Sequence, residues 1–354
     1  MERYLFPPRQ EELETGRVLR KAIEAHAALG ELKGVARSIP NAAILLNTLV
    51  MQEAKDSSAV ENIITTHDEL FKANLFQDLA GAETKEVLGY AEALQTGFRF
   101  LKEHRFLNIN LILQLQSVLL RNNAGFRRLP GTVLKNDLTG EVVHTPPQHY
   151  DEIVALMGQL EHYLNDADDQ TDPLVRMAVL HFQFESIHPF YDGNGRTGRI
   201  LNILYLCLND LLDYPILYLS RFIIQNKADY YRLLQEVRET RQWEPWVLFM
   251  LEGVRETARL TITQIDAIRA LMDRYKREIR EHLPNIYSKD LLESLFKHPY
   301  TKIAYIENDL NIHYHTARSY LEKLCDHGFL MKFSSGKHNY YFNQPLLDLF
   351  SGGH

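Results

Sequence analysis

The sequence predicts a mainly α-helical fold with two short β-hairpins, and three observations support this prediction. Apolar residues recur at the spacing of an amphipathic helix over most of the 354 residues. Long polar–apolar alternation and turn dipeptides are both sparse. The helical pattern breaks near residues 125–147 and 329–342, where β-favouring segments flank turn residues.

The helices can be placed by apolar spacing and by start signals. Pro40 is one such signal, because proline is favourable at the first position of a helix. We expect helices at 12–32, 40–49, 61–76, 83–102, 111–120, 150–165, 172–185, 200–208, 230–238 and 245–271.

A strongly charged segment, 273–281, marks the main domain boundary. It is typical of a solvated helix, and Pro284 ends it. Beyond it, three short helices are expected at 286–296, 301–310 and 316–327. We therefore divide the chain into an N-terminal helical region (1–105), a central core (106–272), a charged linker helix (273–284) and a C-terminal domain (285–354).

Composition is that of an ordinary globular protein. The net charge of −7 argues against a chain that coats nucleic acid non-specifically. The two cysteines, Cys207 and Cys325, lie in apolar helical patterns, which argues against a disulfide scaffold. No secretory h-region and no apolar run of about 18 residues is visible. We expect a cytoplasmic protein that makes no membrane contact.

The segment His188–Arg199 carries the densest chemistry. Gly193, Asn194 and Gly195 form a turn directly before a helix, whose first N–H groups lack internal partners and can bind phosphate. Arg196 and Arg199 are three residues apart and can share one helix face. His188 is a candidate general base, and Asp192 a candidate Mg²⁺ ligand. The alternative is an ordinary helix start with a buried histidine and surface arginines.

This segment resembles the Fic family signature, HPFx(D/E)GNGRxxR, and matches every fixed position. The resemblance implies a Fic-type helical core that binds ATP with Mg²⁺. It implies transfer of AMP to a Ser, Thr or Tyr hydroxyl of a target protein, or of the chain itself, with release of pyrophosphate. It further implies that Asn194 supports the α-phosphate, that Arg196 contacts the phosphates and that Arg199 holds the γ-phosphate.

Two further segments resemble parts of a Fic core. The hairpin at 131–144 would be the flap that aligns a target segment by β-strand addition. The alternative is an ordinary hairpin that closes a helical domain. Tyr230 and Tyr231 resemble the tyrosine pair that closes the nucleotide pocket. In a plain helix, one tyrosine would lie in the core and the other at the surface.

Ser57, Glu61 and Asn62 match the family's inhibitory motif, (S/T)xxxE(G/N). This resemblance implies that a helix docks beside the ATP site and that Glu61 pairs with Arg199. The arginine is then unavailable to the γ-phosphate, so the enzyme is autoinhibited. The alternative is that Ser57 or Ser58 caps a helix and Glu61 stabilises its first turn.

The C-terminal domain resembles a winged helix-turn-helix, with a hairpin wing at 332–341. Ala317, Tyr320, Leu321 and Leu324 should face its core. A modestly basic face would comprise His313, His315, Arg318, Lys323, Lys337 and His338. The sequence is compatible with three roles for this domain: DNA binding, contact with another protein, and homodimerisation. Four of its histidines lack the spacing of a metal site.

The same residues fit two other functions. One is removal of AMP from a modified protein, with Glu61 orienting a water molecule. The other is a transcriptional regulator whose core senses nucleotide and whose winged helix binds DNA. A sensor needs no general base, so His188 argues against the second.

Overall fold

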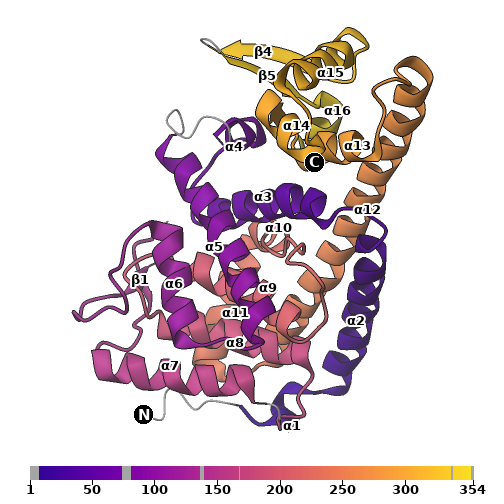
Figure 1. Cartoon of the computed structure of the whole chain (residues 1–354). Helices are drawn as coiled ribbons and strands as arrows, with labels where there is room; N and C mark the ends of the chain where they lie inside the picture. Colours follow the sequence, from indigo (N-terminus) through magenta and orange to yellow (C-terminus); the bar gives the residue numbers. More distant parts are fainter. Residues whose placement is uncertain (1–7, 74–80, 136–138, 167, 336–337, 352–354) are drawn as a thin grey trace.

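The computed structural model describes residues 8–73, 81–135, 139–166, 168–335 and 338–351. Most of these residues are helical, and the strands form two small antiparallel sheets (Figure 1). The predicted mainly α fold is therefore confirmed. None of the helices in these ranges is long and apolar enough to span a lipid bilayer.

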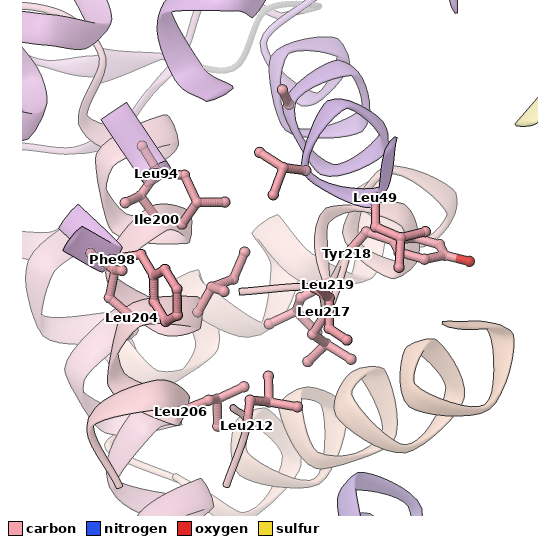
Figure 2. Close-up of a cluster of buried hydrophobic side chains, with 14 of the residues drawn as sticks. Leu49, Leu94, Phe98, Ile200, Leu204, Leu206, Leu212, Leu217, Tyr218 and Leu219 are labelled. Atoms are coloured by element: carbon pink, nitrogen blue, oxygen red, sulfur yellow. The ribbon is translucent and has the colours of Figure 1, made fainter. Parts of the chain in front are cut away.

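The helix α9 (Asn194–Leu208) lies at the centre of the core. It packs against α5 (Ala82–His104), α6 (Ile109–Leu120) and α8 (Pro173–Ile187). Figure 2 shows Leu94 and Phe98 of α5 beside Ile200 and Leu204 of α9. A Cβ on Gly97 would lie 2.4 Å from a methyl of Leu204, so glycine is needed where these two helices approach.

The remaining core helices surround this centre. The described part of the core also includes α7 (Tyr150–Asn165), α10 (Ser220–Gln225) and α11 (Lys227–Thr240). The strands of the flap hairpin are β1 (Leu134–Lys135) and β2 (Val142–His144). At the N-terminal end, α1 (Gln10–Leu13) precedes α2 (Gly16–Ala36), which packs along α12 (Glu244–His282) (Figure 1).

The helix α3 (Ala42–Val60) is longer than predicted. We expected it to end at residue 49, because polar residues interrupt the apolar pattern beyond that point. Glu53, Asp56 and Ser57 are nevertheless all buried. Tertiary partners, which the sequence pattern does not reveal, stabilise them within the helix.

The predicted helix at 61–76 is wrong at its start. Glu61 caps the C-terminal end of α3, and Asn62 has a φ of 63°, a left-handed conformation that commonly ends helices. A separate short helix, α4 (His67–Ala73), follows, and residues 74–80 lie outside the described ranges. The alternative in which Ser57 or Ser58 caps a helix start is also wrong, because both residues lie in the last turn of α3.

The helix α12 runs continuously from the core into the charged segment that we expected to be a linker. The C-terminal domain then contains α13 (Lys289–Lys297), β3 (Tyr300–Lys302), α14 (Ile303–Leu310), α15 (Tyr314–Asp326), β4 (Met331–Ser335), β5 (His338–Phe342) and α16 (Gln344–Ser351). Its sheet has the order β3-β5-β4, with both pairs antiparallel. The sequence pattern did not predict β3 or α16.

The helix α15 has the expected inner face. Ala317, Leu321 and Leu324 are fully buried, and Tyr320 is partly buried. On the predicted basic face, Arg318 is paired with Glu322 of its own helix at 2.9 Å. Lys337 lies outside the described residues.

Candidate active site

The signature forms a tight turn between α8 and α9. Asp172 caps the start of α8, and His188 ends it with a φ of 49°. The Asn194 side chain accepts a hydrogen bond from the Phe190 N–H and donates one to the Phe190 carbonyl, both at 2.8 Å. Asn194 therefore holds the loop closed, a role that the sequence did not reveal. Phe190 is fully buried, so its ring packs in the core.

The start of α9 presents backbone donors to the site. Gly193 has a φ of 75°, which few other residues adopt without strain, and it precedes the first helical residue. The first N–H groups of a helix have no acceptors within that helix and carry partial positive charge. This end of α9 is therefore suited to bind an anion.

His188 is neutral at pH 7. Burial lowers the pKa of its ring to about 3, and the positive charges of Arg127 and Arg238 add to this effect. Its Nδ1 atom is buried without a hydrogen-bond partner among the described residues. A neutral imidazole keeps one unprotonated ring nitrogen, which makes His188 a candidate to accept a proton from an attacking hydroxyl.

Arg127 supports this turn, although the sequence analysis missed it. Its Nε donates to the His188 carbonyl at 2.8 Å and its Nη2 to the Ile187 carbonyl at 3.3 Å. Its own N–H donates to the Pro189 carbonyl at 2.9 Å. The contact joins residues about 60 positions apart, and no local pattern marks it.

Glu61 contacts both signature arginines. Its carboxylate accepts a hydrogen bond from Arg196 Nε at 2.7 Å and another from Arg199 Nη2 at 2.8 Å. Arg199 also donates to the Ser57 hydroxyl at 2.8 Å and to the Ser57 carbonyl at 2.9 Å. Both guanidinium groups are buried. The resemblance implied the Arg199 contact, but not the Arg196 contact.

Two neighbours complete this cluster. Arg196 also donates to Glu86 of α5 at 2.8 Å, a partner that the sequence analysis missed. A Cβ on Gly195 would lie 2.5 Å from Glu61 Oε1, so glycine at this position lets the carboxylate reach the arginines. Asn62 lies beside the cluster and accepts a hydrogen bond from Lys227 at 3.2 Å.

Asp192 is an exposed carboxylate at the rim. One of its oxygens accepts a hydrogen bond from the Gly193 N–H at 2.6 Å and lies 3.6 Å from Arg196 Nη2. No group of three or more metal-binding side chains occurs in the described part of the chain. A single carboxylate fits Mg²⁺ bound to a nucleotide, because phosphate oxygens and water supply the other ligands.

The two tyrosines of α11 differ in environment. Tyr230 is 1% exposed, and its hydroxyl pairs with His181 Nε2 at 2.8 Å. Tyr231 is 48% exposed, and its ring packs edge-on against Tyr230 at 5.1 Å. This is the arrangement of one core and one surface tyrosine. Tyr231 is thus the better placed to meet a ligand.

The flap is fastened to the signature loop. The Tyr191 hydroxyl accepts hydrogen bonds from the N–H groups of Arg128 and Leu129, at 2.9 and 3.1 Å. His144, at the end of β2, bonds to the Ser186 carbonyl at 2.9 Å. The hairpin pairs Leu134 with His144, and residues 136–138 at its tip lie outside the described ranges. Tyr191 occupies the variable position of the signature, so the sequence motif did not mark it as a site residue.

A groove of about 900 Å³ runs along β2. It is lined by Val142 and Val143 of the flap, Ser186 of α8, and Arg238 of α11. Ser186 is two residues before His188, and Arg238 is close enough to lower the pKa of that histidine. The groove therefore joins the flap to α8 and α11, the helices that precede and follow the signature helix, and His188 is not among its lining residues.

Models of three protein families match the chain in succession. They are the N-terminal region of the Fic/DOC family (residues 19–99), the Fic/DOC family (106–206), and the C-terminal domain of SoFic-like protein adenylyltransferases (271–346). The chain belongs to the Fic/DOC family.

Curated relatives match part of this Fic chain. "Protein adenylyltransferase Fic" of Drosophila grimshawi is 33% identical over 121 residues, which are 33% of this chain and 23% of the relative. "Protein adenylyltransferase fic-1" of Caenorhabditis briggsae is 29% identical over 163 residues, covering 43% and 29% of the two chains. The matches thus span less than a third of these relatives.

Solved structures share the Fic fold. A Fic family protein from Desulfovibrio desulfuricans G20 has a TM-score of 0.58 at 19% identity, over 93% of this chain and 96% of that one. Fic-1 from C. elegans has a TM-score of 0.54 at 21% identity, over 70% and 73%. At these identities, the likeness concerns the fold.

Proposed function

We propose that this protein transfers AMP from ATP to the side-chain hydroxyl of a protein, and that Glu61 restrains the reaction. One observation carries the proposal: a neutral, buried histidine and a helix start suited to bind an anion lie in one turn of chain, with two buried arginines beside them. The names of the curated relatives support the same reaction.

The chain's residues can serve each need of the reaction. The target hydroxyl oxygen attacks the α-phosphorus, the bond from that phosphorus to the bridging oxygen breaks, and pyrophosphate leaves. His188 accepts the hydroxyl proton. The N–H groups at the start of α9 stabilise charge on the phosphate oxygens, as preorganised donors do in other transferases. When bound beside Asp192, Mg²⁺ would supply further neutralisation of the phosphates.

The flap and its groove would hold the target. The described sheet pairs β2 only with β1, and residues of β2 line the groove. An extended target segment could pair with that edge through its main chain and present a hydroxyl toward His188. We retain three predictions from the sequence. They are self-modification, homodimerisation, and contact with DNA or protein through a winged helix at 285–354.

Glu61 would act as an internal inhibitor. It engages the two arginines that a triphosphate requires, and a carboxylate bound by two buried guanidinium groups is hard to displace. ATP must therefore compete with a contact within the chain. Because both Glu61 oxygens are engaged by arginines, we favour AMP transfer over a reaction in which Glu61 orients water for AMP removal.

Differently labelled ATP tests the reaction type. Glu61→Gly protein is incubated with Mg²⁺ and ATP labelled at the α- or the γ-phosphate, and protein-bound label is measured. Label retained only from α-labelled ATP supports AMP transfer, and Glu61→Gly/His188→Ala is the matched inactive control. Label retained from γ-labelled ATP would overturn the proposal in favour of phosphate transfer.

A further inference from the structure

The helix that ends at Glu61 is buried on both sides. A helix at the surface of a domain usually buries one stripe and exposes the other. In α3, fully buried residues instead occur around the whole helix, among them Ile44, Leu49 and Val50. Figure 1 shows the reason: α3 lies between the core below it and the C-terminal domain above it.

The inner side of α3 is fixed to the core by a polar contact. The buried carboxylate of Glu53 accepts hydrogen bonds from the Tyr90 hydroxyl at 2.8 Å and from the Ser220 N–H at 3.0 Å. Leu49 lies on this side as well, close to Tyr218 and Leu219 (Figure 2).

The outer side is held by the C-terminal domain. The side chain of Asn47 donates to the Lys297 carbonyl at the end of α13, at 3.0 Å. The side chain of Gln52 donates to the Phe350 carbonyl of α16 at 3.5 Å. Helical periodicity places Met51 between these two contacts, and it is also buried.

The same domain contacts the chain beyond Glu61. The Tyr300 hydroxyl of β3 donates to the Asp68 carboxylate of α4. The helix α16 packs against α4 as well as against α12. The C-terminal domain therefore touches the chain on both sides of the inhibitory glutamate, at Gln52 before it and at Asp68 after it.

From these contacts we propose that the C-terminal domain positions Glu61 and so forms part of the inhibitory device. We assign the positioning role to Asn47 and Tyr300, because they make the contacts that join this domain to α3 and α4. Neither residue is among those assigned above to catalysis or nucleotide binding. Gln52 and Glu61 are nine residues apart on one rigid helix, about 14 Å along its axis. A shift of α3 that withdraws Glu61 from the arginines must therefore disturb the contacts with Lys297 and Phe350.

This arrangement gives the C-terminal domain a route to the active site. Its α15 and the β4–β5 hairpin lie on the side away from α3 (Figure 1). Anything that displaces the domain from α3 and α4 would favour the state in which ATP reaches Arg196 and Arg199, because these contacts hold α3 in the position from which Glu61 reaches the arginines. The inference rests on the proposed function.

The test removes single contacts in the full-length chain. Asn47→Ala and Tyr300→Phe each delete one hydrogen bond, and Arg318→Ala, which breaks an exposed pair on α15, is the matched control. ATP affinity is measured by calorimetry and AMP transfer by protein mass. We expect each interface variant to bind ATP roughly two- to ten-fold more tightly and to transfer AMP faster, as one lost hydrogen bond implies. The control should match the wild type.

The decisive comparison adds the same changes to Glu61→Gly. Once Glu61 is absent, the interface variants should give no further increase. Unchanged or weaker ATP binding by folded Asn47→Ala and Tyr300→Phe proteins would overturn the inference, as would an equal gain with and without Glu61. Failure of AMP transfer in Glu61→Gly would refute the proposed function alone, because ATP affinity still reports on the positioning of Glu61.

Discussion

The carboxylate of Glu61 accepts a hydrogen bond from Arg199 at 2.8 Å, although the two residues are 138 positions apart in the chain. The same carboxylate also accepts a hydrogen bond from Arg196, so one side chain at the end of α3 engages both cations of the signature. Under the inhibition that we propose, this contact would therefore occupy more of the phosphate site than pairing with Arg199 alone would.

Ser57→Ala should relieve inhibition partly. The change removes the acceptor for Arg199 Nε, which leaves a buried donor unpaired at a cost of about 1–3 kcal/mol in the inhibited state. The Ser57 carbonyl and Glu61 still hold Arg199 through Nη2, so AMP transfer should rise less than in Glu61→Gly. Rates of AMP incorporation in the two variants check this. A rate for Ser57→Ala at or below wild type would show that the hydroxyl does not contribute to inhibition.

Tyr191→Phe should lower kcat/KM for a protein target and leave the KM for ATP unchanged. The hydroxyl accepts two N–H groups at the base of the flap, and its loss should loosen the hairpin. Because the site is half exposed, water can replace part of the contact, and we expect a roughly two- to ten-fold lower kcat/KM for a protein target in the Glu61→Gly background. An equal change in the KM for ATP would contradict a role confined to the flap.

The activity should persist at mildly acidic pH. Burial and neighbouring positive charges lower the pKa of His188 to about 3, so the free enzyme keeps its base unprotonated well below pH 6.5. The acid limb of kcat/KM against pH, measured with Glu61→Gly protein, should therefore fall below about pH 5. A limb centred near 6.5 would mean that the ring is solvated in solution.

Glu53→Gln should change how stability depends on pH. Burial raises the pKa of Glu53 from 4.5 to about 7, so the folded state binds more protons than the unfolded state between these values. The free energy of unfolding of the wild type should thus fall across this window as pH rises, whereas glutamine does not titrate.

Urea unfolding at pH 5 and pH 8 checks this effect. From the lower to the higher pH, the wild type should lose on the order of 1–3 kcal/mol relative to Glu53→Gln. Glu185, whose pKa burial also raises to about 7, is common to both proteins and cancels. Parallel pH dependences would show that Glu53 is charged throughout.

The sequence predicted those parts of the site that are local. The turn at 188–199 and its helix depend on consecutive residues, and Glu61 could be paired with Arg199 through a motif resemblance. Arg127, Tyr191 and Glu86 were missed because each acts through a partner about 60 or more positions away. Such contacts arise from packing and leave no periodic signal.

The same contrast between local patterns and long-range contacts applies to the helices of the fold. The boundaries of α7 were predicted to the residue, because its amphipathic pattern is regular and its buried residues share one face. The end of α3 was not, because Glu53 and Ser57 read as polar surface until Tyr90 and Arg199 are placed against them. Both faces of α3 are covered, which hides the periodicity that would have marked it as a single long helix.

We propose that AMP transfer depends on His188 as the general base and that Glu61 restrains the reaction. The most direct test is intact-protein mass spectrometry after incubation with Mg²⁺ and ATP, comparing wild type, Glu61→Gly and Glu61→Gly/His188→Ala. We predict an AMP-sized mass gain in Glu61→Gly that exceeds the wild type and disappears in the double variant. No gain in folded Glu61→Gly that binds ATP, even with a cell extract as the source of targets, would contradict the account.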